Sequence, residues 1–191
     1  KDTFANKGYH ETSISEIVRQ AGIARSTFYQ YFDSKLHLFE SILETLLQDL
    51  SDAIKPISLA PGSLTPLVQI QGNLTRVLDL VVKERNLSRI LMHQTGALDR
   101  TMVGQLDGFY SQVAGMIQRS LDLGVAMNLV RACDTRVTSF SIIGAVKEVV
   151  FQLTSTQESW PSTDKIGTQL LEFAMGGILI HPQNSFMKTT R

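Results

Sequence analysis

A short segment near the start of the chain carries side chains that can hydrogen-bond to nucleic acid. Phe28 and Phe32 are four positions apart, so on a helix they share one face. The remaining positions carry a guanidinium, hydroxyls and phenols, at Arg25, Ser26, Thr27, Tyr29 and Tyr31. Arginine can contact phosphate or the O6 and N7 atoms of guanine, and short hydroxyl side chains permit close approach. The pattern predicts a helix that is buried on one side and suits duplex DNA on the other.

A second short helix is predicted directly before this segment. Ser13 and Glu16 have the spacing of a capping box, and Gly22 is a typical helix end. Two short helices joined by a glycine-containing turn suit a helix-turn-helix, whose second helix enters the major groove. The same arrangement also occurs in many helical bundles that do not bind DNA. The residues before them look like the last turns of a helix that stops at Gly8, and we expect that the start of this helix precedes Lys1.

Most of the remaining chain also has apolar residues three and four positions apart, which predicts an all-α fold. Ser34 is expected to cap a helix that reaches about Asp52 and is long enough to connect two bodies. Three prolines predict a loop over 55–66. Further helices are predicted over about 67–83, 87–95, 98–123, 135–153 and 163–180, with Gly124 ending one and Asp134 capping another.

Composition narrows the classes of function. Of 191 residues, 43% are hydrophobic and 19% are charged, against a usual charged share of about 25%, which favours extra burial against a partner chain. Eighteen basic and eighteen acidic residues cancel, so any nucleic-acid site must be local. Cys133 is the single cysteine, which excludes an internal disulfide framework. With no apolar run of roughly 18 residues and no signal-peptide pattern, we expect a cytoplasmic chain with no membrane partner.

Patterns typical of catalysis are missing from the sequence. Its histidines, His10, His37, His93 and His181, are scattered and do not have the spacing of metal ligands. Neither a glycine-rich phosphate loop nor a nucleophile elbow is present. We therefore expect a chain that is not an enzyme, with no catalytic residue, metal or cofactor.

The N-terminal residues resemble the signature of the TetR/AcrR transcriptional regulators. The resemblance is carried by residues 8–18, 21–23, 26–32, 34–35 and Leu38. It implies a three-helix DNA-binding domain at 1–45, with its first helix truncated, and a helical ligand-binding and dimerisation domain at 46–191. It further implies a homodimer on a palindromic operator, acting as a repressor or, less often, an activator.

The same resemblance assigns roles to individual residues. Thr12 or Ser13 would contact phosphate, and Arg25, Ser26 and Thr27 would meet base edges. Tyr29, Tyr31 and Lys35 would hold the DNA backbone, whereas Phe28 and Phe32 would be core residues.

The C-terminal half is expected to bind an effector and a second copy of the chain. The last two long helices are apolar on more than one face, which favours a four-helix interface between copies over a monomeric bundle core. The scarcity of charged residues in these segments favours a small effector that is mainly apolar or amphipathic. Its candidate contacts are Met92, His93, Met102, Phe109, Tyr110, Val113, Phe140, Lys147 and Phe151. The alternative function is an all-helical enzyme or small-molecule carrier without DNA binding.

Overall fold

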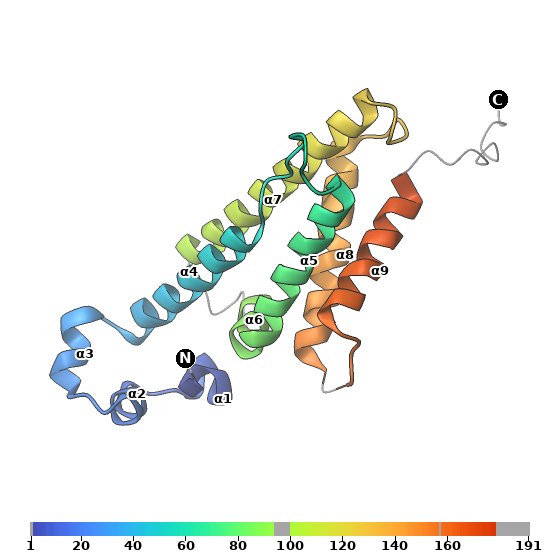
Figure 1. Ribbon diagram of the computed structural model, residues 1–191. Coiled ribbons are helices and arrows are strands. Elements are labelled where there is room, and N and C mark those ends of the chain that lie inside the picture. Colours follow the sequence, from blue (N-terminus) through green and yellow to red (C-terminus); the bar gives the residue numbers. More distant parts are fainter. Residues whose placement is uncertain (1, 94–99, 157, 179–191) are drawn as a thin grey trace, which may run out of the picture.

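The computed structural model describes residues 2–93, 100–156 and 158–178. Within these ranges the chain forms nine α-helices and no β-strand, which confirms the predicted all-α fold class. Figure 1 shows α2 and α3 at one end of the molecule and α8 and α9 side by side toward the other. The long helix α4 runs between these two ends, so it connects the predicted DNA-binding part to the predicted effector part.

The first helix, α1 (Asp2–Glu11), changes direction at Gly8. Gly8 has φ 82° and ψ 170°, a backbone conformation that glycine adopts at little cost and other residues avoid. The predicted helix end at Gly8 is therefore a kink, after which the helix continues for one more turn.

The next two helices, α2 (Ile14–Ala21) and α3 (Arg25–Tyr31), form the predicted helix-turn-helix. The Ser13 hydroxyl accepts a hydrogen bond from the Glu16 N–H at 3.3 Å, and the Glu16 carboxylate accepts one from the Ser13 N–H at 3.1 Å. Gly22 ends α2 in the left-handed conformation, with φ 66°. Both predicted signals, the capping box and the glycine stop, are confirmed.

A proline-rich loop separates α4 (Lys35–Ala53) from α5 (Pro66–Lys83), as the composition predicts. Ser34 caps α4 by accepting a hydrogen bond from the His37 N–H at 3.0 Å. The loop is tied to α5 by Asn73, which accepts from the Lys55 N–H and donates to the Lys55 carbonyl, both at 2.9 Å. The end of α4 is thereby fixed against α5.

The remaining helices are α6 (Arg85–His93), α7 (Arg100–Ala126), α8 (Thr135–Ser155) and α9 (Thr163–Ile178). Asp134 caps α8 as predicted, its carboxylate accepting from the Val137 N–H at 3.0 Å. The predicted end of α7 at Gly124 is wrong by two residues. A Cβ at Gly124 would lie 2.6 Å from Val130 Cγ2, so glycine is needed there for the close return of the chain rather than as a helix stop.

One cluster of buried side chains joins the N-terminal helices to the rest. It includes Phe4 of α1 and Phe39 of α4, which are 1% and 0% exposed, and it continues into α5 to α9. The buried members beyond these two are Leu43, Leu46, Leu47, Leu50, Leu78, Val81, Leu87, Leu106, Val150, Leu153 and Ile166. In addition, α6 packs against α1. Because α4 and this cluster both cross the predicted division between 1–45 and 46–191, that division stays a prediction.

Candidate DNA-binding surface and effector region

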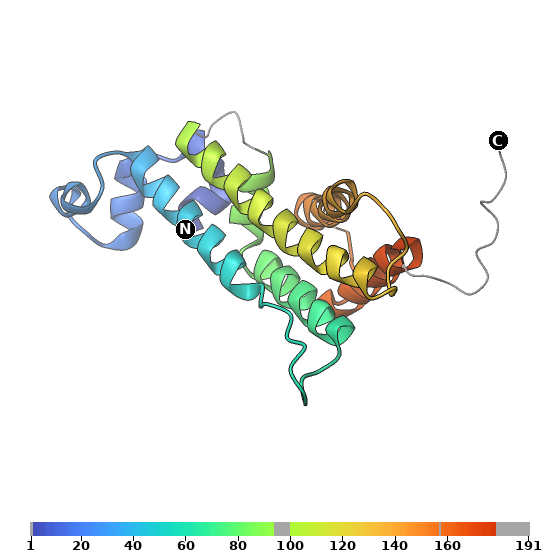
Figure 2. The same ribbon diagram turned by 90° about the horizontal axis from the view of Figure 1, so that it is seen from above.

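The outer side of α3 is polar and open to solvent. Arg25 and Ser26 are exposed, Thr27 is half-buried, and Tyr29 and Tyr31 are 45% and 70% exposed. On the inner side, Phe28 is 2% exposed and contacts the Phe32 ring, with a centroid distance of 5.7 Å. The amphipathic character predicted for this helix is therefore present, with its hydrogen-bonding groups directed away from the core. Figure 2, seen from above, shows α3 at the extreme end of the molecule, clear of the later helices.

Arg25 and Tyr29 lie next to each other on this outer side. The Arg25 guanidinium is 5.8 Å from the centre of the Tyr29 ring, and its Nη2 donates a hydrogen bond to the Tyr29 hydroxyl at 3.4 Å. A guanidinium held beside a ring loses some of its conformational freedom before it binds a partner, while its other N–H donors stay available. The pair can contact both a base edge and a neighbouring phosphate.

Thr12 and Ser13, the two alternatives predicted for a phosphate contact, lie in different surroundings. Thr12 is 2% exposed, and its hydroxyl donates to the Gly8 carbonyl at 2.7 Å, inside the kink of α1. Ser13 is exposed at the N-terminus of α2. Of the two, Ser13 is the residue that a phosphate can reach.

The charge next to Ser13 is balanced by an ion pair. Lys7 donates to the Glu16 carboxylate, and this hydrogen bond, followed by that from the Ser13 N–H, lowers the pKa of Glu16 to about 2. The carboxylate is therefore ionised at neutral pH, but Lys7 offsets its repulsion of an approaching phosphate. The α2 N-terminus retains its partial positive charge toward DNA.

Lys35 holds the end of α1 instead of extending into solvent. Its Nζ donates to the carbonyls of Tyr9, His10 and Thr12 at 2.8, 3.3 and 2.9 Å, and lies 4.3 Å from the centre of the Tyr9 ring. These carbonyls have no partner within the helix because they are at its end. The Lys35 ammonium thus fixes α1 against the start of α4, next to the helix-turn-helix.

Among the residues predicted to contact an effector, the structure brings together Phe109, Tyr110 and Lys147. The Phe109 and Tyr110 rings on α7 have centroids 5.6 Å apart, and the Lys147 ammonium on α8 lies 4.1 Å from the centre of the Tyr110 ring. Burial raises the pKa of Tyr110 to about 12, so its phenol is neutral throughout the physiological range. An aromatic pair beside a cation can bind an apolar group with a nearby negative charge.

The other predicted effector contacts differ in burial and in position along α7 and α8. Val113 and Phe151 are half-buried on α7 and α8, whereas Phe140 is 50% exposed and lies two turns of α8 before Lys147. The side chains of Met92, His93 and Met102 lie outside the described residues.

Comparison with known proteins shows a similarity to bacterial transcriptional regulators. The family model described as bacterial regulatory proteins of the tetR family matches residues 1–42, which contain α1 to α3 and the start of α4. The chain is also 26% identical over 142 residues to the fatty acid metabolism regulator protein of Bacillus subtilis, covering 68% of this chain and 72% of that relative. Residues 1–42 of the chain therefore match the tetR family of regulatory proteins. The all-helical fold and the DNA-binding helix-turn-helix are those of this family of transcriptional regulators.

Two solved structures of similar fold are complexes with bound ligands. The transcriptional regulator FadR from Bacillus subtilis, in complex with stearoyl-CoA, has a TM-score of 0.67 and 20% identity, over 94% of this chain and 95% of that one. AibR, in complex with isovaleryl coenzyme A and operator DNA, has a TM-score of 0.68 and 16% identity, over 89% and 90% of the two chains. At these identities the likeness concerns the fold. The names of these proteins are those of regulators, in agreement with the prediction that the chain is not an enzyme.

The structural roles of Thr12 and Lys35 were not predicted from the sequence. The hydroxyl of Thr12 is four residues from its acceptor at Gly8, and this short spacing could have indicated a side-chain bond closing the end of α1. The Lys35 ammonium finds its acceptors 23 to 26 residues away. No local pattern could have indicated that contact, because it depends on how α1 and α4 meet.

Proposed function

We propose that the chain is a homodimeric repressor that binds a palindromic operator and is released by a small, mainly apolar effector. The observation that carries this proposal is the outer side of α3, where Arg25, Tyr29 and Tyr31 are exposed while Phe28 anchors the helix from behind. In a helix-turn-helix this is the side that enters the major groove. Arg25, Ser26 and Thr27 would contact base edges, and Tyr29, Tyr31 and Ser13 would contact phosphates.

The proposed role of Lys35 differs from that of these residues. Its ammonium already has three carbonyl acceptors, so we assign it to positioning α1 and the adjacent N-terminus of α2. A direct phosphate contact would require it to leave those acceptors. The two possibilities predict different salt dependences of the affinity for operator DNA.

The dimer would form through α8 and α9. Val137 and Phe140 on α8 are 62% and 50% exposed, and Phe173 on α9 is 74% exposed. Among the described helices, α8 is long and apolar enough to cross a membrane, a test that core helices of soluble proteins also pass. Only 28% of its most apolar stretch is buried within this chain, so most of that stretch is available to a partner. A second copy would cover these side chains, and its two-fold axis would place two α3 helices about 34–36 Å apart, one turn of DNA. A regulator of this kind would work in the cytoplasm.

The effector would bind along α7 and α8. Phe109 and Tyr110 offer aromatic surface, Val113 and Phe151 extend it, and Lys147 supplies a cation at one point. The fold relatives bound to stearoyl-CoA and isovaleryl coenzyme A make acyl thioesters the class of compound to test first. Binding to one of two conformers would shift the population away from the spacing that matches the operator.

The proposal is tested in two steps, which identify the DNA that the protein binds and then the compounds that dissociate the complex. Genomic fragments of the source organism are incubated with the protein, and retarded fragments are sequenced and footprinted. We expect a salt-sensitive, sequence-selective complex on an inverted repeat, which is dissociated by acyl-CoA of a suitable chain length. Retardation of all fragments alike, or of none, would contradict the assignment to a specific operator. Operator binding that no acyl-CoA alters would contradict the effector class and leave the DNA-binding function standing.

A further inference from the structure

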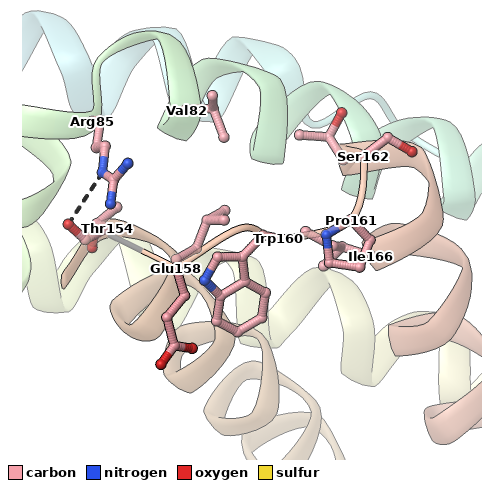
Figure 3. Close-up of a pocket in the computed structure, with 10 residues that line it drawn as sticks. Val82, Arg85, Thr154, Glu158, Trp160, Pro161, Ser162 and Ile166 are labelled. Carbon is pink, nitrogen blue, oxygen red and sulfur yellow. Dashed lines mark hydrogen bonds between the residues drawn. The ribbon is translucent and has the colours of Figure 1, made fainter. Parts of the chain in front are cut away.

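A cleft of about 270 Å³ lies where four helices end or begin, apart from the effector residues on α7 and the middle of α8. Figure 3 shows it between the end of α5, the start of α6, the end of α8 and the segment that leads into α9. Its lining residues are Val82, Arg85, Leu153, Thr154, Glu158, Trp160, Pro161, Ser162, Thr163 and Ile166.

The middle of this cleft is apolar. Leu153 and Ile166 are buried at 7% and 5% exposure, and Val82 lies across the open space from the Trp160 indole. Trp160 is fixed by a hydrogen bond from its Nε1 to the Thr156 hydroxyl at 3.1 Å. Its ring is therefore held in one position and presents a flat wall to a ligand.

One end of the cleft carries a guanidinium (Figure 3). Arg85 Nε donates to the Thr154 carbonyl at 3.4 Å, and its Nη2 donates to the Thr156 carbonyl, both at the end of α8. A guanidinium has five N–H donors. The two bonds to carbonyls fix its plane, and within the described part of the chain they are the hydrogen bonds that the guanidinium makes, so its remaining donors can bind a ligand. An arginine held in this way is preorganised to bind a planar carboxylate.

Two acidic side chains near the cleft do not cancel this cation inside it. The Glu158 carboxylate is on the rim and points away from Val82 and the open space in Figure 3. The Asp79 carboxylate, which is not in the lining, accepts a hydrogen bond from the Thr163 hydroxyl at 2.5 Å. Two helices, α6 and α9, begin at the cleft and two, α5 and α8, end there, so the helix ends bring partial charges of both signs and the Arg85 guanidinium is the group that would select an anion.

We propose that this cleft binds a small organic carboxylate with an aromatic or branched aliphatic body. The carboxylate would accept hydrogen bonds from Arg85 at one end, and the body would lie between Trp160 and Val82. The proposal concerns a site other than the effector region on α7 and α8, and it does not depend on DNA binding.

The chain itself provides the readout, because Trp160 is its only tryptophan. Phenylacetate is titrated into the full chain while the tryptophan emission is recorded, and the uncharged phenylacetamide serves as the matched ligand. We expect a saturable change in emission with phenylacetate and none with the amide over the same concentrations. An equal response to both compounds, or no response to either, would overturn the proposal.

Two substitutions test the two halves of the site. Arg85→Gln should weaken phenylacetate binding about tenfold or more, because a charge-assisted pair is lost. Arg89→Gln, an exposed arginine one turn further along α6, is the matched control and should bind as the unaltered chain does. Val82→Phe should fill the cleft and abolish binding while leaving Arg85 in place. Circular dichroism checks that each variant is folded, and phenylacetate binding that survives Val82→Phe would place the ligand elsewhere and refute the proposed site.

Discussion

The Lys35 ammonium lies 2.8 Å from the carbonyl oxygen of Tyr9 and 4.3 Å from the centre of the ring of the same residue. One cation thus contacts both the main chain and the side chain at the end of α1. This arrangement favours a structural role for Lys35, whereas the family resemblance predicts that it contacts the DNA backbone.

Replacing Lys35 distinguishes these two roles. Lys35→Met should lower the free energy of unfolding by about 1–3 kcal/mol, because it leaves the carbonyls at the end of α1 without their donor. The slope of log affinity against log salt for operator DNA should stay as it is in the unaltered chain. Chemical denaturation and salt titration measure the two quantities. Unchanged stability together with a slope reduced by about one would instead identify Lys35 as a phosphate contact.

Arg25 is expected to supply sequence selectivity. Arg25→Ala should weaken operator binding by about 1–3 kcal/mol and reduce discrimination at the contacted base pair. Arg119→Ala removes an exposed arginine of α7 and should have no comparable effect. Fluorescence anisotropy with operators of altered sequence measures the affinity and the discrimination of each protein. If Arg25→Ala and Arg119→Ala lose affinity to a similar extent, Arg25 contributes only general charge.

The Lys7 and Glu16 pair predicts an acid-dependent loss of stability. The pKa of Glu16 is lowered from 4.5 to about 2 in the folded chain, so its favourable contribution is complete above pH 4.5 and disappears as the pH falls toward 2. Glu16→Gln should remove this part of the pH dependence, and so should Lys7→Met, which removes the largest cause of the shift. Denaturation midpoints measured across this pH range test the prediction. A pH profile unchanged in both variants would show that the pair has no energetic role.

Two glycines of α7 should respond in opposite ways to the same substitution. Gly124→Ala places a methyl group 2.6 Å from Val130 Cγ2 and should destabilise the chain by about 1–3 kcal/mol. Gly108→Ala meets no atom within 4 Å and should stabilise the helix by up to about 1 kcal/mol. Thermal unfolding of the two variants gives the comparison. Equal effects would mean that the turn after α7 opens to admit the methyl group.

The proposed dimer can be disrupted at one exposed side chain. Phe173→Glu introduces a charge on α9 where the interface would be buried, and it should raise the dimer dissociation constant at least about tenfold. Leu59→Glu changes a similarly exposed apolar residue in the loop before α5 and should leave the assembly intact. Sedimentation velocity over a range of concentrations measures both. A dimer that tolerates Phe173→Glu would have to use another surface.

The features that could be predicted from the sequence are those with local causes. Ser13, Ser34 and Asp134 cap helices through bonds to an N–H three residues away, so spacing alone identifies them. The inward position of Phe28 follows from helical periodicity in the same way.

The features that could not be predicted depend on contacts between distant segments. Gly124 resembles a helix stop until the return of Val130 is known, and Arg85 contacts carbonyls 69 and 71 residues away. The cleft beside Trp160 is made by four separate helix ends, and no short pattern describes it.

The shared cluster that joins Phe4 and Phe39 to the later helices limits how this regulator can be re-engineered. A chimera that takes its operator-reading helices from a relative would bring foreign side chains against Leu78 and Leu87, which are fully or almost fully buried here. Because packed interiors tolerate such changes of shape poorly, a working hybrid would have to transplant the matching side chains of α5 and α6 together with the new helices.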